Sequence, residues 1–394
     1  MQPLVTVIIP TYNRESTIKR AIDSVLGQSY KNLEVIVVDD GSSDNTIQIV
    51  NSYQDKRLRL ICLSENCGAN IARNKGIACA NGEYIAFQDS DDEWFKDKLK
   101  IQLNCMTKSN KKVCYCPYIL IENNIKTIVP NCSDSKELCE EKIIDTLRKR
   151  NVIPTPALIL HKEVIETVGM FDETIRRLQD YEYAIRICQK YEIAYVSKPL
   201  LNSYRMEQCI TNNRSALVDS VKKIFIKHIN FIDLDYMLSF YLSYCKIYDF
   251  QGIYTKELQE MYRALQKIKE SEKVKECIET IEYMFQWYRF FDEKIFAKEF
   301  ILYGAGIHGK IAYYTLKDAG AIPRCFWVTH KQQDSSVEGI PILEIPEYPN
   351  KQIPVIISVG KKLQEELIGN LVSRGLKDYF VYPSSKYNGI ARAK

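Results

Sequence analysis

The fold is decided by residues 82–94, which read Gly-Glu-Tyr-Ile-Ala-Phe-Gln-Asp-Ser-Asp-Asp-Glu-Trp. The apolar part, residues 84–87, has the length and character of a buried strand. Carboxylates follow at Asp89, Asp91 and Asp92, and because they repel one another a positive partner is expected there. Hard oxygen ligands of this kind suit Mg²⁺ or Mn²⁺ together with substrate phosphates. The alternative is a solvated acidic turn in which Asp92 caps the next helix.

Composition restricts the class of protein. A chain of 394 residues has room for two or three domains, and 46% hydrophobic with 26% charged residues is an ordinary globular balance. The net charge of +4 is too small to indicate nucleic acid, and it suits an anionic substrate or a membrane surface. The 13 cysteines include no Cys-x-x-Cys pair and accompany only four histidines, so free thiols are expected rather than a zinc site. Without a signal peptide or a long apolar span, a cytoplasmic location is expected, with peripheral contact at the inner face of the membrane.

The first part of the chain alternates between strand patterns and helix patterns. Strands are expected over 5–9, 33–38, 58–63 and 84–87, and the helices between them include 18–26 and 69–80. This alternation predicts a mostly parallel α/β sheet, whose ligands bind beyond the carboxyl ends of the strands. Three polar motifs stand at such ends: Pro10-Thr11-Tyr12, Asp39-Asp40 and Asp89-Ser90-Asp91. Their convergence predicts one site.

Later segments complete the predicted organisation. Strands are expected over 113–122, 157–160 and 193–196, and helices over 136–149 and 180–190. Residues 215–297 have the spacing of several helices, and 298–394 have the pattern of a small Rossmann-like unit. The predicted domains are therefore 1–214, a helical segment 215–297, and 298–394.

Several single residues allow two interpretations. Asp39 and Asp40 could accept hydrogen bonds from a base or a ribose, or could form an ordinary turn. Arg73 could neutralise a phosphate or hold an acidic neighbour, or could be a surface arginine. Asp180 could be a general base that takes a proton from an attacking hydroxyl, or only an N-cap or a partner of the helix dipole at an N-terminus.

A second candidate nucleotide site lies in the last segment. Gly304, Gly306 and Gly309 follow an apolar strand and precede a helix, the context in which backbone N–H groups approach a phosphate. The next strand ends in Val-Thr-His at 328–330, without the acid that a ribose would need, which argues against NAD. The alternative is a degenerate unit used for packing or dimerisation.

Five motifs in the first half of the chain together carry a resemblance. They are Val7-Ile8-Ile9-Pro10-Thr11-Tyr12-Asn13, Val37-Val38-Asp39-Asp40-Gly41-Ser42-Ser43-Asp44, Asn74-Lys75-Gly76, Gly82-Glu83-Tyr84 with Asp89-Ser90-Asp91-Asp92, and Gly169-Met170-Phe171-Asp172-Glu173. In order and spacing this half resembles family 2 glycosyltransferases of the GT-A fold. The C-terminal segment resembles small nucleotide-sugar-binding units.

The resemblance implies roles for particular residues. The positions matching nucleotide-sugar-binding ones are Pro10, Thr11, Tyr12, Asn13, Asp39, Asp40, Arg73, Asp89, Ser90 and Asp91. Asp89 and Asp91 would form the DXD-type motif that holds Mn²⁺ or Mg²⁺. Asp180 falls where the family places its catalytic base, although Gln179 stands where the family often has Glu.

The implied activity is inverting transfer of a sugar from a nucleotide diphosphate, with UDP preferred. The implied acceptor is a hydroxyl of a glycan or lipid-linked glycan in bacterial surface polysaccharide synthesis. Two alternatives stay open: an NAD-linked sugar-nucleotide oxidoreductase that uses the glycine-rich loop at 304–309, and a non-catalytic sugar-nucleotide-binding scaffold. A homo-oligomer is a further candidate, and no nucleic-acid partner is expected.

Overall fold

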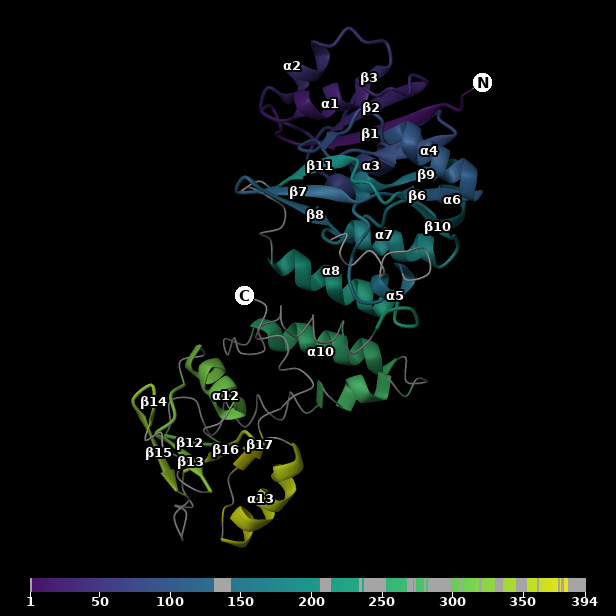
Figure 1. Ribbon diagram of the computed structural model, residues 1–394. Helices are drawn as coiled ribbons and strands as arrows, with labels where there is room; N and C mark the ends of the chain where they lie inside the picture. The colour runs from purple at the N-terminus through teal and green to yellow at the C-terminus, as the bar shows by residue number, and fades with distance from the viewer. Residues whose placement is uncertain are drawn as a thin grey trace. The chain divides into compact units, whose positions relative to one another are not determined.

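The computed structural model divides the chain into two compact units, Met1–Asp233 and Leu234–Lys394 (Figure 1). The residues it describes are 2–130, 143–205, 214–233, 236, 253–267, 272, 274–279, 281–282, 299–304, 307–318, 321–329, 336–344, 353–359, 361–374, 376 and 379–381.

The first unit is built on a seven-stranded, mostly parallel sheet. Its strands are β1 (Val5–Thr11), β2 (Leu33–Asp39), β3 (Leu58–Cys62), β4 (Tyr84–Phe87), β6 (Val113–Tyr115), β9 (Ile159–His161) and β10 (Ile193–Tyr195), in the order β10-β6-β9-β4-β1-β2-β3. Strands β3, β2, β1 and β4 run parallel, and β9 is antiparallel to both β4 and β6. The predicted parallel α/β architecture is therefore confirmed.

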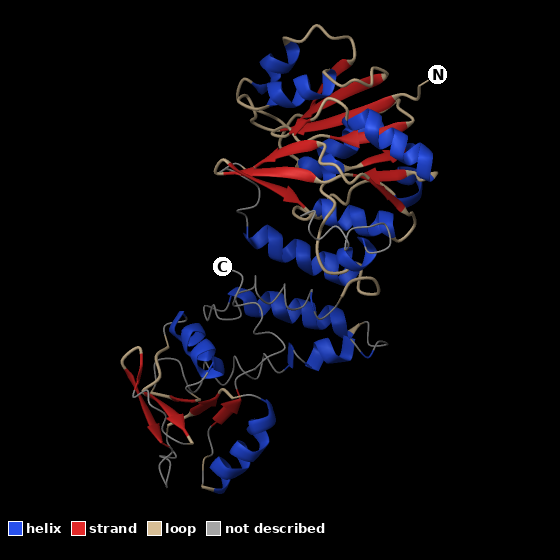
Figure 2. Cartoon of the chain, in the orientation of Figure 1, coloured by secondary structure: helices blue, strands red, loops and turns tan. Residues whose placement is uncertain are grey.

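Helices lie between these strands, as the sequence pattern predicts (Figure 2). They are α1 (Ile18–Leu26), α2 (Thr46–Asn51), α3 (Ala69–Ala78), α4 (Lys98–Ser109), α5 (Ile143–Leu147), α6 (Lys162–Val168), α7 (Gln179–Cys188) and α8 (Arg214–Lys227), together with a 3₁₀ turn at Thr155–Ala157. The expected helix over 136–149 falls partly outside the described residues, and α5 is the part described.

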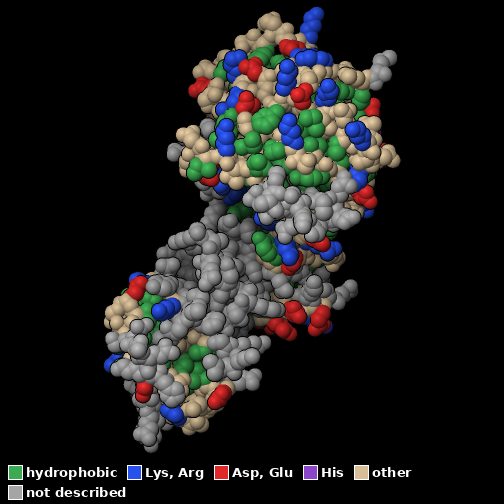
Figure 3. All heavy atoms as spheres, viewed as in Figure 1, with side chains coloured by type: hydrophobic (Ala, Val, Ile, Leu, Met, Phe, Trp, Pro, Cys, Tyr) green, Lys and Arg blue, Asp and Glu red, His purple; other side chains and the backbone are tan. Residues whose placement is uncertain are grey.

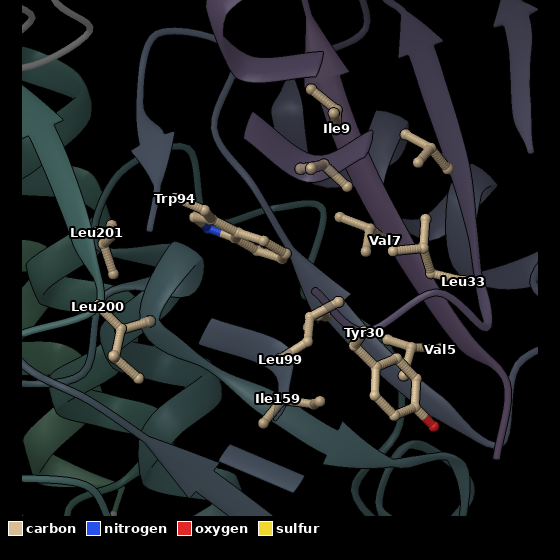
Figure 4. Packing of buried hydrophobic residues seen from close by; sticks show 14 of the residues in the cluster. Val5, Val7, Ile9, Tyr30, Leu33, Trp94, Leu99, Ile159, Leu200 and Leu201 are labelled. Atoms are coloured by element: carbon tan, nitrogen blue, oxygen red, sulfur yellow. The ribbon is translucent and has the colours of Figure 1, made fainter. Parts of the chain in front are cut away.

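One core joins the sheet to the segment that follows the acidic turn. Trp94 is buried beside Leu99 of α4 and beside Leu200 and Leu201 from much later in the chain (Figure 4). Val7 of β1 belongs to the same cluster. Burial of Trp94 therefore anchors the far end of the acidic turn to the core.

A second sheet corrects the expectation of one strand over 113–122. Its strands are β5 (Glu93–Trp94), β11 (Leu201–Tyr204), β7 (Tyr118–Glu122) and β8 (Ile125–Val129), in the order β5-β11-β7-β8. The predicted strand is broken between β6, in the first sheet, and β7, in the second. Pro117 stands at the break and has no N–H to donate to a ladder. Strand β11 follows the expected strand over 193–196 and was not predicted.

The second unit is Rossmann-like, as expected. Its described elements are α10 (Ile253–Gln266), β12 (Ile301–Tyr303), α12 (Ile307–Asp318), β13 (Cys325–Val328), β14 (Ser336–Val337), β15 (Ile340–Glu344), β16 (Val355–Ile357), α13 (Lys361–Ser373) and β17 (Tyr379–Val381). The sheet order is β14-β15-β13-β12-β16-β17, and every pair except β14–β15 is parallel. From β15 to β17 this is the 3-2-1-4-5 order of dinucleotide-binding sheets.

Two glycines of the 304–309 pattern are required by the packing of this unit. Gly304 has φ +110°, and a Cβ there would lie 2.4 Å from the carbonyl oxygen of Ser358. A Cβ on Gly309 would lie 1.6 Å from the carbonyl oxygen of Gly304. Gly306 lies outside the described residues. Close packing thus accounts for Gly304 and Gly309, and a ligand there stays a prediction.

The surface and the thiols give two further observations. On the face in Figure 3, the Lys and Arg side chains of the first unit lie among hydrophobic and acidic ones. The described cysteines are free thiols. Among the described residues, none of the helices combines the length and apolar character needed to cross a bilayer.

Candidate active site

The site is organised by the carboxyl ends of β1, β2 and β4. Thr11 and Asp39 are paired in register, and the Asp40 N–H donates to the Thr11 carbonyl at 2.8 Å. On the other side of β1, the Gln88 N–H donates to the Ile8 carbonyl at 3.0 Å. Because these strands are parallel, the three polar motifs of the sequence end at one edge of the sheet, as predicted.

A pocket at this edge brings together predicted residues from distant parts of the chain. It is lined by Arg73, Asp89, Asp92, Tyr118, Leu120, Pro154, Thr155, Pro156, Gln179, Asp180 and Ser203. Within it, Arg73 Nη2 donates to Asp89 Oδ1 at 2.8 Å. Arg73 is buried, and its other two guanidinium nitrogens have no protein partner. The surface-arginine interpretation is thus wrong, and Arg73 can still donate to a ligand.

Asp180 lies in the first turn of α7 and contributes its carboxylate to the same pocket. Its Oδ1 accepts the Tyr181 N–H at 2.9 Å, and Asn151 also hydrogen-bonds to its side chain. The N-cap of α7 is Leu178, so capping does not explain Asp180. Burial raises the pKa of Asp180, with the charge of Asp89 acting in the same direction. A carboxylate with a raised pKa is a better proton acceptor near neutral pH.

Asp92 is not the solvated cap that the alternative interpretation describes. It is buried, and its Oδ1 accepts the Tyr204 N–H of β11 at 3.1 Å. Burial, with the neighbouring Asp89 and Asp91, raises the pKa of Asp92 well above its usual range. Helix α4 begins only at Lys98. Asp92 therefore ties the acidic turn to the second sheet.

Asp91 faces two arginines of the first helix region. Arg14 Nε lies 3.8 Å from Asp91 Oδ2, and Arg20 donates to the Asp91 carbonyl. Burial, and then the charge of Asp89, raises the pKa of Asp91. Asp89 and Asp91 form a close pair of carboxylates whose charges are only partly offset by neighbouring guanidinium groups.

The loop after β1 contacts the turn after β2. The Asn13 N–H donates to Ser42 Oγ at 2.9 Å, and Asn13 Oδ1 accepts the Ser43 N–H at 2.9 Å. Asn13 has φ 49°, a left-handed conformation that asparagine tolerates. Asp39 accepts the Ser42 N–H at 2.8 Å and keeps one buried oxygen without a protein partner. Tyr12 is 40% exposed beside this loop, so its ring is accessible to a ligand.

Asp40 already uses both of its carboxylate oxygens. They accept the backbone N–H groups of Cys67 and Gly68, each at 2.8 Å. Gly41, with φ +77°, allows this approach, because a Cβ there would lie 2.8 Å from the Glu65 backbone. The observed role of Asp40 is to hold this loop at the end of β2. Its contact with a nucleotide stays a prediction.

The carboxylates at this edge of the sheet fit a hard divalent ion whose remaining ligands are substrate phosphates. Among the described residues, no group of three or more His, Cys, Asp and Glu converges as a metal site. Asp89 and Asp91 supply two carboxylates, and one or two carboxylates with substrate phosphates is the usual way proteins hold Mg²⁺. Burial raises the pKa of Asp91 and the charge of Asp89 acts in the same direction, so a bound cation would offset both effects.

Sequence reasoning missed Arg14, Arg20, Tyr118 and Tyr204. Arg14 directly follows the predicted Pro10–Asn13 motif, which is the signal that could have found it. Arg20 lies on α1 with its guanidinium 3.8 Å from the Tyr204 ring centre. Tyr118 and Tyr204 reach the site only through the second sheet, whose pairing no local pattern predicts.

The sheet order and the pocket at the carboxyl ends of its strands define an α/β fold of the GT-A type. Residues 6–166 match the family model described as Glycosyl transferase family 2. The putative teichuronic acid biosynthesis glycosyltransferase TuaG of Bacillus subtilis is 33% identical over 216 residues, which are 54% of this chain and 83% of TuaG. The chain therefore belongs to glycosyltransferase family 2.

The other similar proteins match over a smaller part of their length or have a lower sequence identity. An uncharacterized glycosyltransferase of Rickettsia typhi is 34% identical over 54% of this chain and 66% of its own length. The UDP-Glc:alpha-D-GlcNAc-diphosphoundecaprenol beta-1,3-glucosyltransferase WfgD of Escherichia coli is 46% identical over 31% of this chain and 48% of WfgD. The crystal structure of S. aureus TarS 1-349 in complex with UDP-GlcNAc has TM-score 0.53 and 21% identity, over 72% of this chain and 91% of TarS 1-349. At this identity TarS supports the fold alone.

Proposed function

We propose that the protein transfers a sugar from a UDP-sugar to a hydroxyl of a glycan or lipid-linked glycan, with inversion at the anomeric carbon. The observation that carries this proposal is the pocket in which Asp89 and Arg73 lie with Asp180. Arg73 and Asp89 can bind a donor's phosphates together with a metal ion, and Asp180 can accept a proton.

The donor would lie along the edge formed by β1, β2 and β4. Its nucleoside would contact Pro10, Thr11, Tyr12, Asn13, Asp39 and Asp40, and its diphosphate would lie near Arg73, Asp89, Ser90 and Asp91. Asp89 and Asp91 would hold Mn²⁺ or Mg²⁺, which when bound supplies Lewis-acid stabilisation of charge on the departing diphosphate. The free N–H groups of Arg73 would stabilise the same charge.

Asp180 would act as the general base. A hydroxyl is a weak nucleophile at neutral pH, so a carboxylate must accept its proton as it attacks the anomeric carbon. Attack from the Asp180 side, with the diphosphate leaving on the other side, is a single displacement. By the geometric argument that applies to glycoside hydrolysis, it inverts the configuration, and an α-linked donor gives a β-linked product.

The acceptor would enter along the second sheet. Tyr118 and Leu120 of β7 and Ser203 of β11 line the pocket beside Asp180, and Ser203 and Leu120 are paired in register. The similarity to WfgD, which is named for a UDP-glucose donor and a GlcNAc-diphosphoundecaprenol acceptor, motivates the preference for UDP and for a lipid-linked glycan. The assignment of TuaG to teichuronic acid biosynthesis motivates a role in surface polysaccharide synthesis. We place this role at the cytoplasmic face of the membrane, as the sequence analysis expects.

Replacement of the proposed base tests this function directly. Asp180→Asn should lower the rate of UDP-sugar turnover by about 10²–10⁴-fold, because general-base catalysis contributes that much. UDP affinity in the presence of Mn²⁺ should stay within about twofold of the parent, because Asp180 contacts the acceptor hydroxyl rather than the nucleotide. Donor hydrolysis and calorimetric UDP binding give the two quantities.

Asp145→Asn is the matched control, because it makes the same chemical change at a side chain that is 74% exposed on α5. Asp145→Asn should leave both the rate of UDP-sugar turnover and the UDP affinity unchanged. Full turnover in Asp180→Asn would remove Asp180 from the mechanism. A change in nicotinamide absorbance with a sugar-nucleotide substrate would instead support the oxidoreductase alternative.

A further inference from the structure

The guanidinium of Arg14 lies between the two halves of the proposed donor site. Its Nη1 donates to the carbonyls of Tyr12 at 3.3 Å and Asn13 at 3.1 Å, on the nucleoside side. Its Nε lies 3.8 Å from Asp91 Oδ2, on the metal side. The Arg14 N–H donates to Thr46 Oγ1 at 2.7 Å, which fixes the backbone. A positive group therefore borders the path that a diphosphate must follow from nucleoside to metal.

Both carboxylates proposed for the metal already face a guanidinium group. Asp89 accepts from Arg73 at 2.8 Å, and Asp91 faces Arg14. A divalent cation that arrives alone would meet these two positive charges at close range. A diphosphate that arrives with the metal brings negative charge that both the arginines and the metal can share.

Arg14 and Arg20 differ in how they contact Asp91. Arg20 donates to the Asp91 carbonyl and lies 3.8 Å from the Tyr204 ring centre, which anchors it on two sides. The Arg14–Asp91 pair is longer than a hydrogen bond, and its side chains are 26% and 20% exposed. Partly exposed pairs of this kind stabilise a fold little, so Asp91 can exchange Arg14 for another cation at small cost.

We propose that Arg14 holds the place of the metal at Asp91 in the free protein and binds the diphosphate when the donor arrives. The metal then binds tightly only together with the nucleotide. This inference rests on the proposed function, because it assumes a nucleotide diphosphate and a divalent ion at this edge. Metal and nucleotide are coupled through Arg14, and the coupling must be reciprocal.

The experiment measures Mn²⁺ binding to the full chain by the electron paramagnetic resonance signal of free Mn²⁺, with and without UDP. In the parent protein, UDP should tighten Mn²⁺ binding by about tenfold or more, within the range of ordinary coupling energies. Arg14→Gln removes the charge and keeps a hydrogen-bond donor. It should bind Mn²⁺ alone more tightly than the parent, bind UDP more weakly, and reduce the coupling toward onefold.

Two further variants separate the role of charge from that of structure. Arg14→Lys keeps the charge and should recover part of the coupling. Lys19→Ala removes one positive charge from an exposed position on α1 and should behave like the parent. Thermal melts of each variant establish that the comparison is made between folded proteins.

Unchanged Mn²⁺ affinity and unchanged coupling in folded Arg14→Gln would overturn the inference while leaving the proposed function intact. So would tight Mn²⁺ binding to the parent without UDP. If the parent binds neither UDP nor Mn²⁺ under any condition, the proposed function itself fails and this inference fails with it.

Discussion

At the scale of single residues, three aspartates in one turn have three different environments. Asp89 is paired with Arg73, Asp91 faces Arg14, and Asp92 is buried against β11. Burial raises the pKa of both Asp91 and Asp92, and more strongly for Asp92. Two of these side chains can therefore serve a bound cation, while Asp92 holds the turn in place.

Glu182, two residues after Asp180 on α7, holds this helix in place. It is buried, and its Oε1 lies 2.9 Å from Arg186 Nε, 2.9 Å from Lys227 Nζ and 3.2 Å from His228 Nε2. Burial alone would raise the pKa of Glu182, but hydrogen bonds from His228 and Arg186 outweigh it and lower the pKa to about 2. Its charged form thus stabilises the native state.

Glu182→Gln should lower the free energy of unfolding by about 3 kcal/mol at neutral pH, because it removes a buried carboxylate that pairs with Arg186 and Lys227. A carboxylate whose folded pKa is depressed contributes stability above its unfolded pKa and loses it as the pH falls through the folded value. The difference between parent and variant should therefore shrink as the pH falls from about 4.5 to about 2. Urea unfolding measured across this range gives the result.

Glu163→Gln provides the comparison for that measurement. Glu163 pairs with Lys112 at the surface, where both side chains are almost half exposed. Its replacement should change the free energy of unfolding much less than Glu182→Gln does, because a solvent-exposed ion pair contributes little to stability. Equal losses in the two variants would show that the Glu182 cluster gives no special stability.

At the scale of elements, α8 is joined to the first unit by specific contacts. Ser220 Oγ accepts the Arg177 N–H at 3.0 Å, and Lys223 Nζ donates to the Thr174 carbonyl at 2.8 Å. Its buried apolar residues are Leu217, Val218, Val221, Ile224 and Phe225. The boundary predicted at residue 214 would separate α8 from these partners.

A chain that ends after residue 233 should fold cooperatively, whereas one that ends after residue 213 should not. Burying one large apolar side chain is worth about 1.5–3 kcal/mol, so removing the apolar face of α8 removes about as much free energy as a whole domain usually has. Thermal unfolding followed by circular dichroism distinguishes the two. Equal midpoints would show that α8 belongs to a separate segment, as the sequence analysis expects.

At the scale of the whole molecule, local pattern predicted the first part of the large sheet better than the second sheet. The strands and helices from Val5 to Phe87 could be predicted because apolar spacing and turn residues agree there. Parallel topology then predicted that Thr11, Asp39 and Asp89 would share an edge.

The features that sequence analysis did not predict depend on contacts between segments far apart in the sequence. After β6 the chain leaves the first sheet at Pro117. Strand β7 then pairs with β11, more than eighty positions later in the chain. That pairing brings Tyr118 and Ser203 to the pocket and buries Asp92, and it has no local signal. Arg20 reaches the Asp91 carbonyl across a similar separation, so its role could not be predicted either.

The central claim is that the edge carrying Asp89 and Asp91 binds a nucleotide sugar together with a divalent cation. Calorimetric titration with a panel of nucleotide sugars tests it most directly, with Mn²⁺, with EDTA, and in Asp91→Asn. The account predicts that a UDP-sugar binds with Mn²⁺, and that affinity falls about tenfold or more with EDTA or in Asp91→Asn. The claim would be contradicted if no nucleotide sugar binds, or if the affinity is the same with Mn²⁺, with EDTA and in Asp91→Asn.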